Sequence, residues 1–260
     1  MTRLGYKVAI VTGGATDFSA QAAAVLAQNG ATLLLASQNE DEGQQAAAAL
    51  CAKGHRAEFH HLIPTDPLSW AALVDKTMRT HGHLDVLVNH SAASLSTTIE
   101  DATAPQLREM LEQGLAAPFL GMKAAIPAMR QSGGGSIINI AANPVIGALP
   151  LYPLYSAARA GLVSLTHSTA LHCQQRGYDI RVNAIHPGAH ESEGLTEDAL
   201  RSIKARNLHA LLGTMPVRAE GKLYDFASTI LHLADDESME LTGAELFCTG
   251  PLAGLDFPQS

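Results

Sequence analysis

The chain has 260 residues, of which 47% are hydrophobic and 16% are charged, and its formal net charge is −8 at pH 7. This negative charge excludes the basic surface of a protein that binds nucleic acid or an anionic membrane. No apolar run reaches the length of a membrane-spanning helix, and residues 1–7 lack the cleavage site of a secretory signal, so we expect a cytoplasmic protein.

Strands and helices alternate along the sequence without an intervening linker, which predicts one domain over residues 1–260. The predicted strands are residues 7–12, 31–36, 56–62, 84–89, 136–141, 180–185 and 244–248. The predicted helices are residues 19–29, 39–53, 66–80, 105–130, 154–176 and 223–234. This alternation predicts the α/β class and a doubly wound parallel sheet of the Rossmann type, which binds its ligands at the carboxyl ends of the strands.

The cysteine and histidine residues give no sign of a disulfide framework or a metal site. Cys51, Cys173 and Cys248 are odd in number and far apart, so we expect reduced residues in the core. Histidines occur in close pairs such as His60 and His61, but no cysteine or carboxylate joins them at the spacing of zinc ligands. We therefore predict no metal.

Six motifs stand in order at or near the predicted strand ends. They are VTGGATDFS at 11–19, LDVLVNHSA at 84–92, GSIINIAA at 135–142, YSAAR at 155–159, RVNAIHPG at 181–188 and LTGAELFCTG at 241–250. Together they resemble the short-chain dehydrogenase/reductase family over nearly the whole chain. The resemblance implies NAD(P)-dependent oxidation of an alcohol or reduction of a ketone. In that family a Tyr is the acid/base, a Lys tunes it, a Ser holds the carbonyl and an Asn relays protons.

The resemblance also marks the positions that would hold the dinucleotide. In this chain they are Thr12, Gly13, Phe18, Ser37, Asn89, Pro187, Gly188 and Ser192. Asp17 and Ser19 stand where the family has the second and third glycine of its phosphate loop. A carboxylate roughly 4 Å from a phosphate costs on the order of 4 kcal/mol at an effective dielectric constant of about 20. We therefore expect the chain alone to bind no cofactor, and NAD or NADP to bind only if the site still works or in a partner subunit.

Further positions of the expected dinucleotide site depart from the family. Ser37 and Gln38 follow the second strand. In the family this place has an acidic residue that binds the ribose or an arginine that binds a 2′-phosphate, and this chain has neither. Ile63 stands where the family has the Asp that holds the adenine amine, and His90 adds bulk beside Asn89.

The catalytic positions are altered as well. Tyr155 is retained, and Arg159 one helical turn later can lower the pKa of the phenol through its positive charge. The resemblance puts Ala142 at the position of the family serine and Gly114 at that of the relay asparagine. We therefore interpret Tyr155 and Arg159 as vestigial catalytic residues.

These departures favour a catalytically impaired subunit that supports an active paralogue in a hetero-oligomeric NAD(P)-dependent alcohol or β-hydroxyacyl oxidoreductase. The family implies assembly as a dimer or tetramer through the two long helices, residues 105–130 and 154–176, and a homo-oligomer is the other expectation for partners.

Three alternatives stay open. The chain is an active NAD(P)-dependent oxidoreductase with an altered site if Asn143 or His90 replaces the lost serine. It is a cofactor-independent enzyme if its Tyr-x-x-x-Arg spacing carries the resemblance to halohydrin dehalogenases, although those enzymes need a serine where this chain has Ala142. It is a ligand-binding or regulatory protein if the old pocket serves another molecule.

Overall fold

Seven parallel strands form one sheet in the computed structural model, which describes residues 2–13, 17–91, 93–141, 151–187 and 223–248. The strands are β1 (Val8–Thr12), β2 (Thr32–Ser37), β3 (Arg56–His61), β4 (Val86–Asn89), β5 (Gly135–Ile140), β6 (Ile180–Pro187) and β7 (Glu245–Cys248). Their spatial order is β3-β2-β1-β4-β5-β6-β7, and every neighbouring pair is parallel. The predicted doubly wound sheet is confirmed, and its strand order reverses between β1 and β4.

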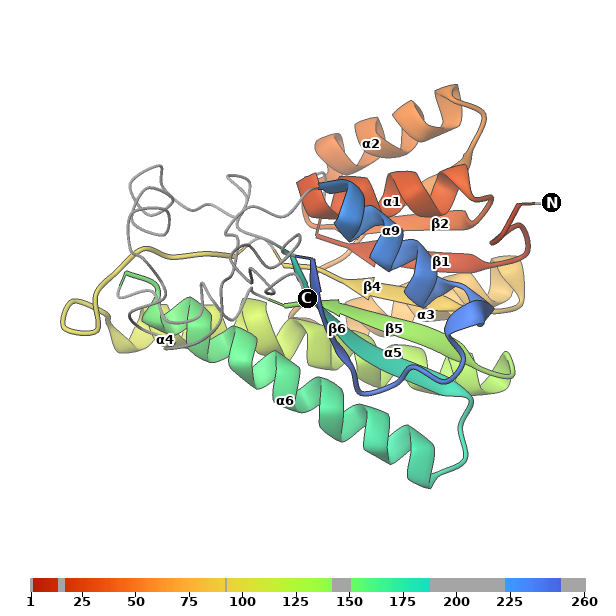
Figure 1. The fold of residues 1–260 in the computed structure, drawn as a ribbon. Coiled ribbons are helices and arrows are strands. Elements are labelled where there is room, and N and C mark those ends of the chain that lie inside the picture. Colours follow the sequence, from red (N-terminus) through yellow and green to blue (C-terminus); the bar gives the residue numbers. More distant parts are fainter. Residues whose placement is uncertain (1, 14–16, 92, 142–150, 188–222, 249–260) are drawn as a thin grey trace, which may run out of the picture.

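Helices cover both faces of the sheet (Figure 1). One face carries α1 (Asp17–Gln28), α2 (Glu40–Ala52) and α9 (Leu223–Ala234), and the other carries α3 (Pro67–His81), α4 (Ala104–Leu111), α5 (Ala117–Gln131) and α6 (Pro153–Gln175). Successive side chains of β1 point to opposite faces, as strand geometry requires. Ala9 and Val11 pack into the core with α1 and α9, whereas Val8 and Ile10 pack into the core with α3, α5 and α6.

Local sequence explains where α3 begins and ends. The Asp66 side chain accepts hydrogen bonds from the backbone N–H groups of Leu68 and Ser69, and Pro67 occupies the first helical position. Gly82 ends the helix in the left-handed conformation, with φ of 82°. The start predicted at residues 66 and 67 is therefore confirmed.

The helix predicted as one continuous element over residues 105–130 contains an irregular turn. Between α4 and α5, residues Glu112–Ala116 form one π-helical turn, which inserts an extra residue into the helix. Gly114 lies buried within this turn, and a Cβ atom added to it would come within 2.9 Å of the Cβ of Ala158 on α6. The close approach of α6 therefore explains why a residue without a side chain occupies this position.

The first residues are clasped against the end of α9 by charged groups at the amino-terminal edge of the sheet. The Arg3 guanidinium lies 2.6 Å from the Asp235 carboxylate, and the buried Lys7 ammonium pairs with Asp236. Tyr6 donates a hydrogen bond to Asp236, which together with burial raises the pKa of the phenol to about 12. This cluster, which we call the clasp, lies at the opposite end of the strands from the predicted ligand site.

The prediction that the cysteine residues lie in the core can be compared with the described part of the chain. Cys173 and Cys248 are buried as expected, but Cys51 is exposed, so the core prediction is wrong for that residue. Within the described ranges, no three metal-ligating side chains are grouped so that they could hold a metal ion. None of the described helices is both long and apolar enough to cross a membrane.

Candidate functional site

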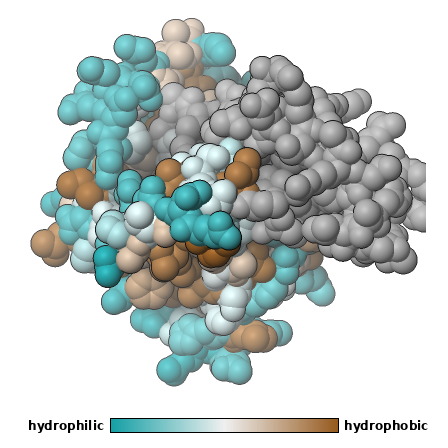
Figure 2. Space-filling view, turned by 90° about the vertical axis from the view of Figure 1, so that its left-hand side faces the viewer, coloured by the Kyte–Doolittle hydropathy of each residue, from teal (hydrophilic) through white to brown (hydrophobic). Residues whose placement is uncertain are grey.

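A cavity of about 220 Å³ opens at the carboxyl ends of β1, β2 and β4, where the strand order reverses. Its lining residues are Thr12, Gly13, Ser37, Gln38, Pro64, Trp70, Asn89, His90, Ser91, Ala93, Gln113, Ala117 and Pro118. This is the place at which doubly wound sheets bind ligands. Figure 2 looks toward this edge of the molecule and shows hydrophobic and hydrophilic side chains mixed over the described surface.

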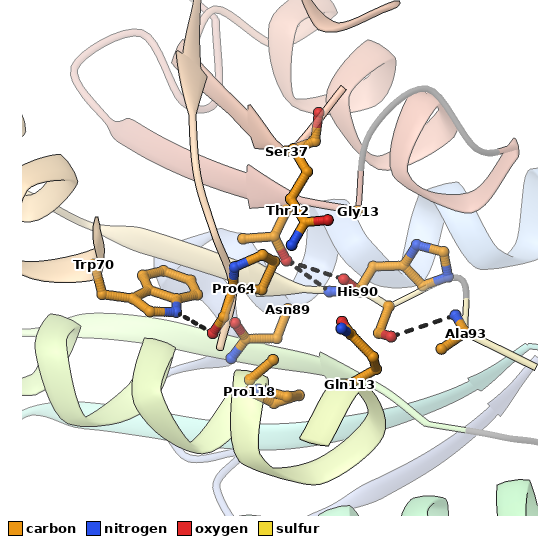
Figure 3. Close-up of a pocket in the computed structure, with 13 residues that line it drawn as sticks. Thr12, Gly13, Ser37, Pro64, Trp70, Asn89, His90, Ala93, Gln113 and Pro118 are labelled. Atoms are coloured by element: carbon orange, nitrogen blue, oxygen red, sulfur yellow. Dashed lines mark hydrogen bonds between the residues drawn. The ribbon is translucent and has the colours of Figure 1, made fainter. Parts of the chain in front are cut away.

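Thr12 and His90 join the ends of β1 and β4 at the base of the cavity (Figure 3). The Thr12 hydroxyl accepts a hydrogen bond of 3.0 Å from the His90 backbone N–H and donates one of 3.1 Å to the His90 carbonyl. Gly13 follows with φ of 103°, and a Cβ atom there would lie only 2.6 Å from Nδ1 of His90. Glycine is therefore required at position 13 both by the backbone conformation and by the His90 side chain.

His90 is a neutral side chain in this structure. Burial, together with the positive charge of nearby Arg159, lowers the pKa of His90 to about 3. Its ring meets the edge of Phe18 at a centroid distance of 6.1 Å, and Phe18 in turn packs against Phe226 at 5.0 Å. Phe18, predicted to bind a cofactor, thus lies in the core behind the cavity and does not line it.

The helix that would receive a phosphate is described only in part. α1 begins at Asp17, whose side chain lies outside the described residues, as do residues 14–16. Ser19 is buried, and its hydroxyl lies 3.4 Å from the Gly13 carbonyl oxygen. The charge conflict expected between Asp17 and a diphosphate stays a prediction.

Near β2, the residues that line the cavity differ from those expected for a nucleotide site. Ser37 lines the cavity, and its hydroxyl donates a hydrogen bond of 3.2 Å to the Asn39 carbonyl. Ile63 is 41% exposed and does not line the cavity, whereas the next residue, Pro64, does. Pro64 also accepts a hydrogen bond of 2.9 Å from the indole of Trp70, which forms an apolar wall.

Asn89 links β4 to its neighbours. Its Nδ2 donates a hydrogen bond of 2.9 Å to Asn139 on β5, and Asn139 donates one of 2.8 Å to Thr166 on α6. Among the described residues, the buried Oδ1 of Asn89 has no hydrogen-bond partner. A side chain at Gly121 would approach this oxygen to 2.7 Å, so Gly121 allows α5 to lie against Asn89.

Tyr155 and Arg159, the predicted catalytic pair, lie together on α6 and are both buried. The centre of the Arg159 guanidinium is 5.1 Å from the centre of the Tyr155 ring. The guanidinium donates hydrogen bonds to the carbonyls of Ile140, at 3.3 Å, and Ser91. Its Nε has no hydrogen-bond partner within the described part of the chain. The positive charge is therefore fixed between the ends of β4 and β5.

Several predicted positions cannot be compared with the structure. Ala142, Asn143, Gly188 and Ser192 lie outside the described residues. Pro187 is the last residue of β6, which runs two residues beyond its predicted end at residue 185, and the contact of Pro187 with a cofactor stays a prediction.

The cavity also contains residues that were not identified from the sequence as part of the site. Trp70, Gln113 and Pro118 line it, although none belongs to a motif of the sequence. Gln113 lies on the π-helical turn, directly before Gly114.

The described lining residues fit the adenosine part of a dinucleotide. They combine an apolar wall, made by Pro64, Trp70 and Pro118, with the neutral polar side chains of Ser37 and Gln38. Among the described lining residues there is no Asp, Glu, Lys or Arg. An uncharged, flat and polar group suits such a cavity better than a phosphate does.

The comparisons with known proteins agree with this fold. A family model described as enoyl-(acyl carrier protein) reductase matches residues 14–250. The chain is 35% identical to trans-4-hydroxycyclohexanecarboxylate dehydrogenase from Sinomonas cyclohexanicum, over 95% of this chain and 93% of that protein. It is 33% identical to 3-beta-hydroxysteroid dehydrogenase from Comamonas testosteroni, over 97% and 98% of the two chains.

Solved structures are similar over the same extent. A protein from Burkholderia xenovorans, described as a short-chain dehydrogenase/reductase, superposes with a TM-score of 0.83 at 28% identity and covers 96% of this chain and 97% of its own. A short-chain dehydrogenase from Mycobacterium smegmatis gives a TM-score of 0.78 at 25% identity, over 95% and 93% of the two chains.

Proposed function

Because the chain belongs to the short-chain dehydrogenase/reductase family, we propose that it is an oxidoreductase that interconverts a secondary alcohol and its ketone with NAD(P). The relatives named above are dehydrogenases of hydroxyl groups, and a third, cyclopentanol dehydrogenase from Comamonas testosteroni, is 29% identical over 96% of this chain and 98% of that protein. Their names support a substrate whose hydroxyl group is borne on an aliphatic ring.

The observation that carries this proposal is the buried pair of Tyr155 and Arg159. The Arg159 guanidinium lies 5.1 Å from the centre of the phenol ring, so its positive charge would act on the phenol oxygen during a proton transfer. Tyr155 would give a proton to the substrate oxygen during reduction and take it back during oxidation. The nicotinamide, when bound, would supply or accept the hydride.

The rest of the described site would bind and orient. Ser37, Gln38 and the apolar wall would hold the adenosine part of the cofactor, while the Thr12–His90 link would keep the ends of β1 and β4 at a fixed separation. The buried hydrogen bonds of Arg159 would hold its charge in place without a change of rotamer during the reaction. A cytoplasmic location fits the three free cysteines.

The relatives support the active enzyme with an altered site better than the impaired subunit that the sequence favoured. The impaired subunit remains a second candidate because Gly114 offers no side chain for a proton relay and its contact with Ala158 leaves little room for one. The dehalogenase alternative has only the Tyr-x-x-x-Arg spacing in its support.

For assembly we propose an oligomer formed through the surface groove between the end of α4, the π-helical turn, α5 and α6. Its volume is about 550 Å³, and Leu111, Leu115, Phe119 and Leu165 line it. Phe119 is 43% exposed in the single chain. A second copy of this chain or a paralogue of the family would bury these side chains.

The test is a cofactor titration and an activity measurement on the purified full chain. Calorimetry with NADH and NADPH measures binding, and the reduction of NAD+ or NADP+ in the presence of cyclopentanol, cyclohexanol or a 3-hydroxysteroid measures turnover. We expect binding and turnover by the wild type, and loss of turnover with retained binding in Tyr155→Phe. Absence of both in the purified chain, with turnover in a mixed oligomer that contains a paralogue, would favour the impaired subunit.

A further inference from the structure

Most hydrogen-bonding groups around the cavity are already engaged with the protein. The Thr12 hydroxyl is bonded to the backbone of His90, and the Ser37 hydroxyl donates to Asn39. The Nδ2 of Asn89 donates to Asn139. These bonded groups shape the cavity, and among them only the buried Oδ1 of Asn89 is left without a described partner.

Two further carboxamides have no described partner for any of their polar atoms. Gln38, exposed at the end of β2, and Gln113, half-buried on the π-helical turn, both line the cavity and make no hydrogen bond with any of the described residues. They belong to different elements, one on each side of the sheet's switch point. A carboxamide carries both donors and an acceptor, so each can bind a neutral polar group of either kind.

Gln113 reaches the cavity from the π-helical turn. Gly114 is buried against Ala158 on α6, and the residue before it is turned toward the cavity. In Figure 3 the Gln113 side chain extends from its helix into the space beside Asn89 and His90. Single π-helical turns of this kind are frequently found at functional sites.

We propose that Gln113 is a specificity-determining residue, whose carboxamide hydrogen-bonds the uncharged nucleoside part of the bound ligand. This inference rests on the proposed function, because that function supplies an adenine nucleoside to the cavity. The lining provides no described charged side chain, so neutral hydrogen bonds must select the ligand there. Paired donors and acceptors of a carboxamide match those on the edge of an adenine base.

The probe is ADP-ribose, which contains the nucleoside but no nicotinamide. Its affinity for the full chain is measured by calorimetry in the wild type, in Gln113→Leu and in Gln131→Leu. The last variant is a matched control, because Gln131 is exposed at the far end of α5 and does not line the cavity. Thermal unfolding of each variant checks that the fold is retained.

We expect Gln113→Leu to weaken ADP-ribose binding by about tenfold, as the loss of a buried hydrogen bond would, and Gln131→Leu to leave it unchanged. Equal affinity in the wild type and Gln113→Leu overturns the inference, while turnover by the wild type would leave the proposed function intact. Conversely, Gln113-dependent binding in a chain without turnover supports the inference and contradicts the proposed function. Failure of the wild type to bind either ADP-ribose or NADH overturns both.

Discussion

Arg159 lies one helical turn beyond Tyr155, with its guanidinium 5.1 Å from the centre of the phenol ring and its hydrogen bonds donated to the carbonyls of Ser91 and Ile140. The same side chain therefore holds the ends of β4 and β5 and provides the positive charge beside the phenol. Its structural and electrostatic roles can be separated experimentally.

Arg159→Lys is expected to keep the charge but to lose the two-carbonyl bridge, because an ammonium group cannot reproduce the planar fork of a guanidinium. The free energy of unfolding should fall by about 2 kcal/mol, the scale of lost hydrogen bonds to a charged group. Denaturant unfolding measures this change. Arg176→Lys, at the exposed end of α6, is the control and should be neutral; equal stability of the two variants would contradict the bridging role.

His90 should make the protein less stable as the pH falls below neutral. Its pKa in the folded chain is lowered to about 3, so the unfolded chain binds more protons between pH 3 and the usual histidine pKa of 6.5. Stability from this group is therefore complete above about pH 6.5 and is lost below it, by about 2 kcal/mol between pH 7 and pH 5.

The measurement for His90 is the unfolding free energy of the wild type and of His90→Asn at both pH values. The variant keeps the backbone bonds between position 90 and Thr12, since these do not involve the side chain. We expect a smaller loss of stability at pH 5 in the variant than in the wild type. The same loss in both proteins would show that the imidazole is not the titrating group.

Restoring an asparagine at Gly114 is expected to destabilise the protein. The added Cβ would lie 2.9 Å from the Cβ of Ala158, and such overpacking costs about 1 to 3 kcal/mol. The double variant Gly114→Asn/Ala158→Gly removes the clash and should recover part of the loss. Thermal unfolding of both variants and of Ala158→Gly alone tests the coupling, and additive effects would refute it.

The chain should bind NADH more tightly than NADPH. No described residue lining the cavity is cationic, and Glu40, Asp41 and Glu42 form the first turn of α2, directly after β2. Gln38→Arg is expected to tighten NADPH binding by about tenfold, because an arginine can pair with a 2′-phosphate. Calorimetry with both cofactors measures this change. Gln28→Arg is the control, because Gln28 is exposed at the end of α1. A wild type that prefers NADPH would contradict the prediction.

The sequence predicted the fold well because the pattern of the elements is strong and local. Apolar runs such as β4 and the Asp66–Pro67 helix start are encoded by neighbouring residues. Gly114 was also identified from the sequence as a position that lacks the family side chain. The π-helical turn was not predicted, because one inserted residue changes the spacing of the apolar residues at a single turn only, which is too short an interval to stand out against the 3.6-residue period.

The site was less predictable, since its chemistry depends on packing between distant segments. That His90 is neutral follows from its burial next to Phe18 and Arg159, and nothing near it in the sequence indicates that burial. That Gln113 lines the cavity could not be predicted either, because it lies on the π-helical turn.

The clasp has a consequence for the order in which the chain can fold during synthesis. Arg3 and Asp235 are 232 positions apart in the sequence, so the carboxylate that pairs with Arg3 is translated long after Arg3 itself. Until Asp236 has been translated, Lys7 lacks the carboxylate with which it forms an ion pair in the native structure. A nascent chain would therefore lack the clasp until residues 235 and 236 have been translated, and slower translation ahead of them should prolong that state.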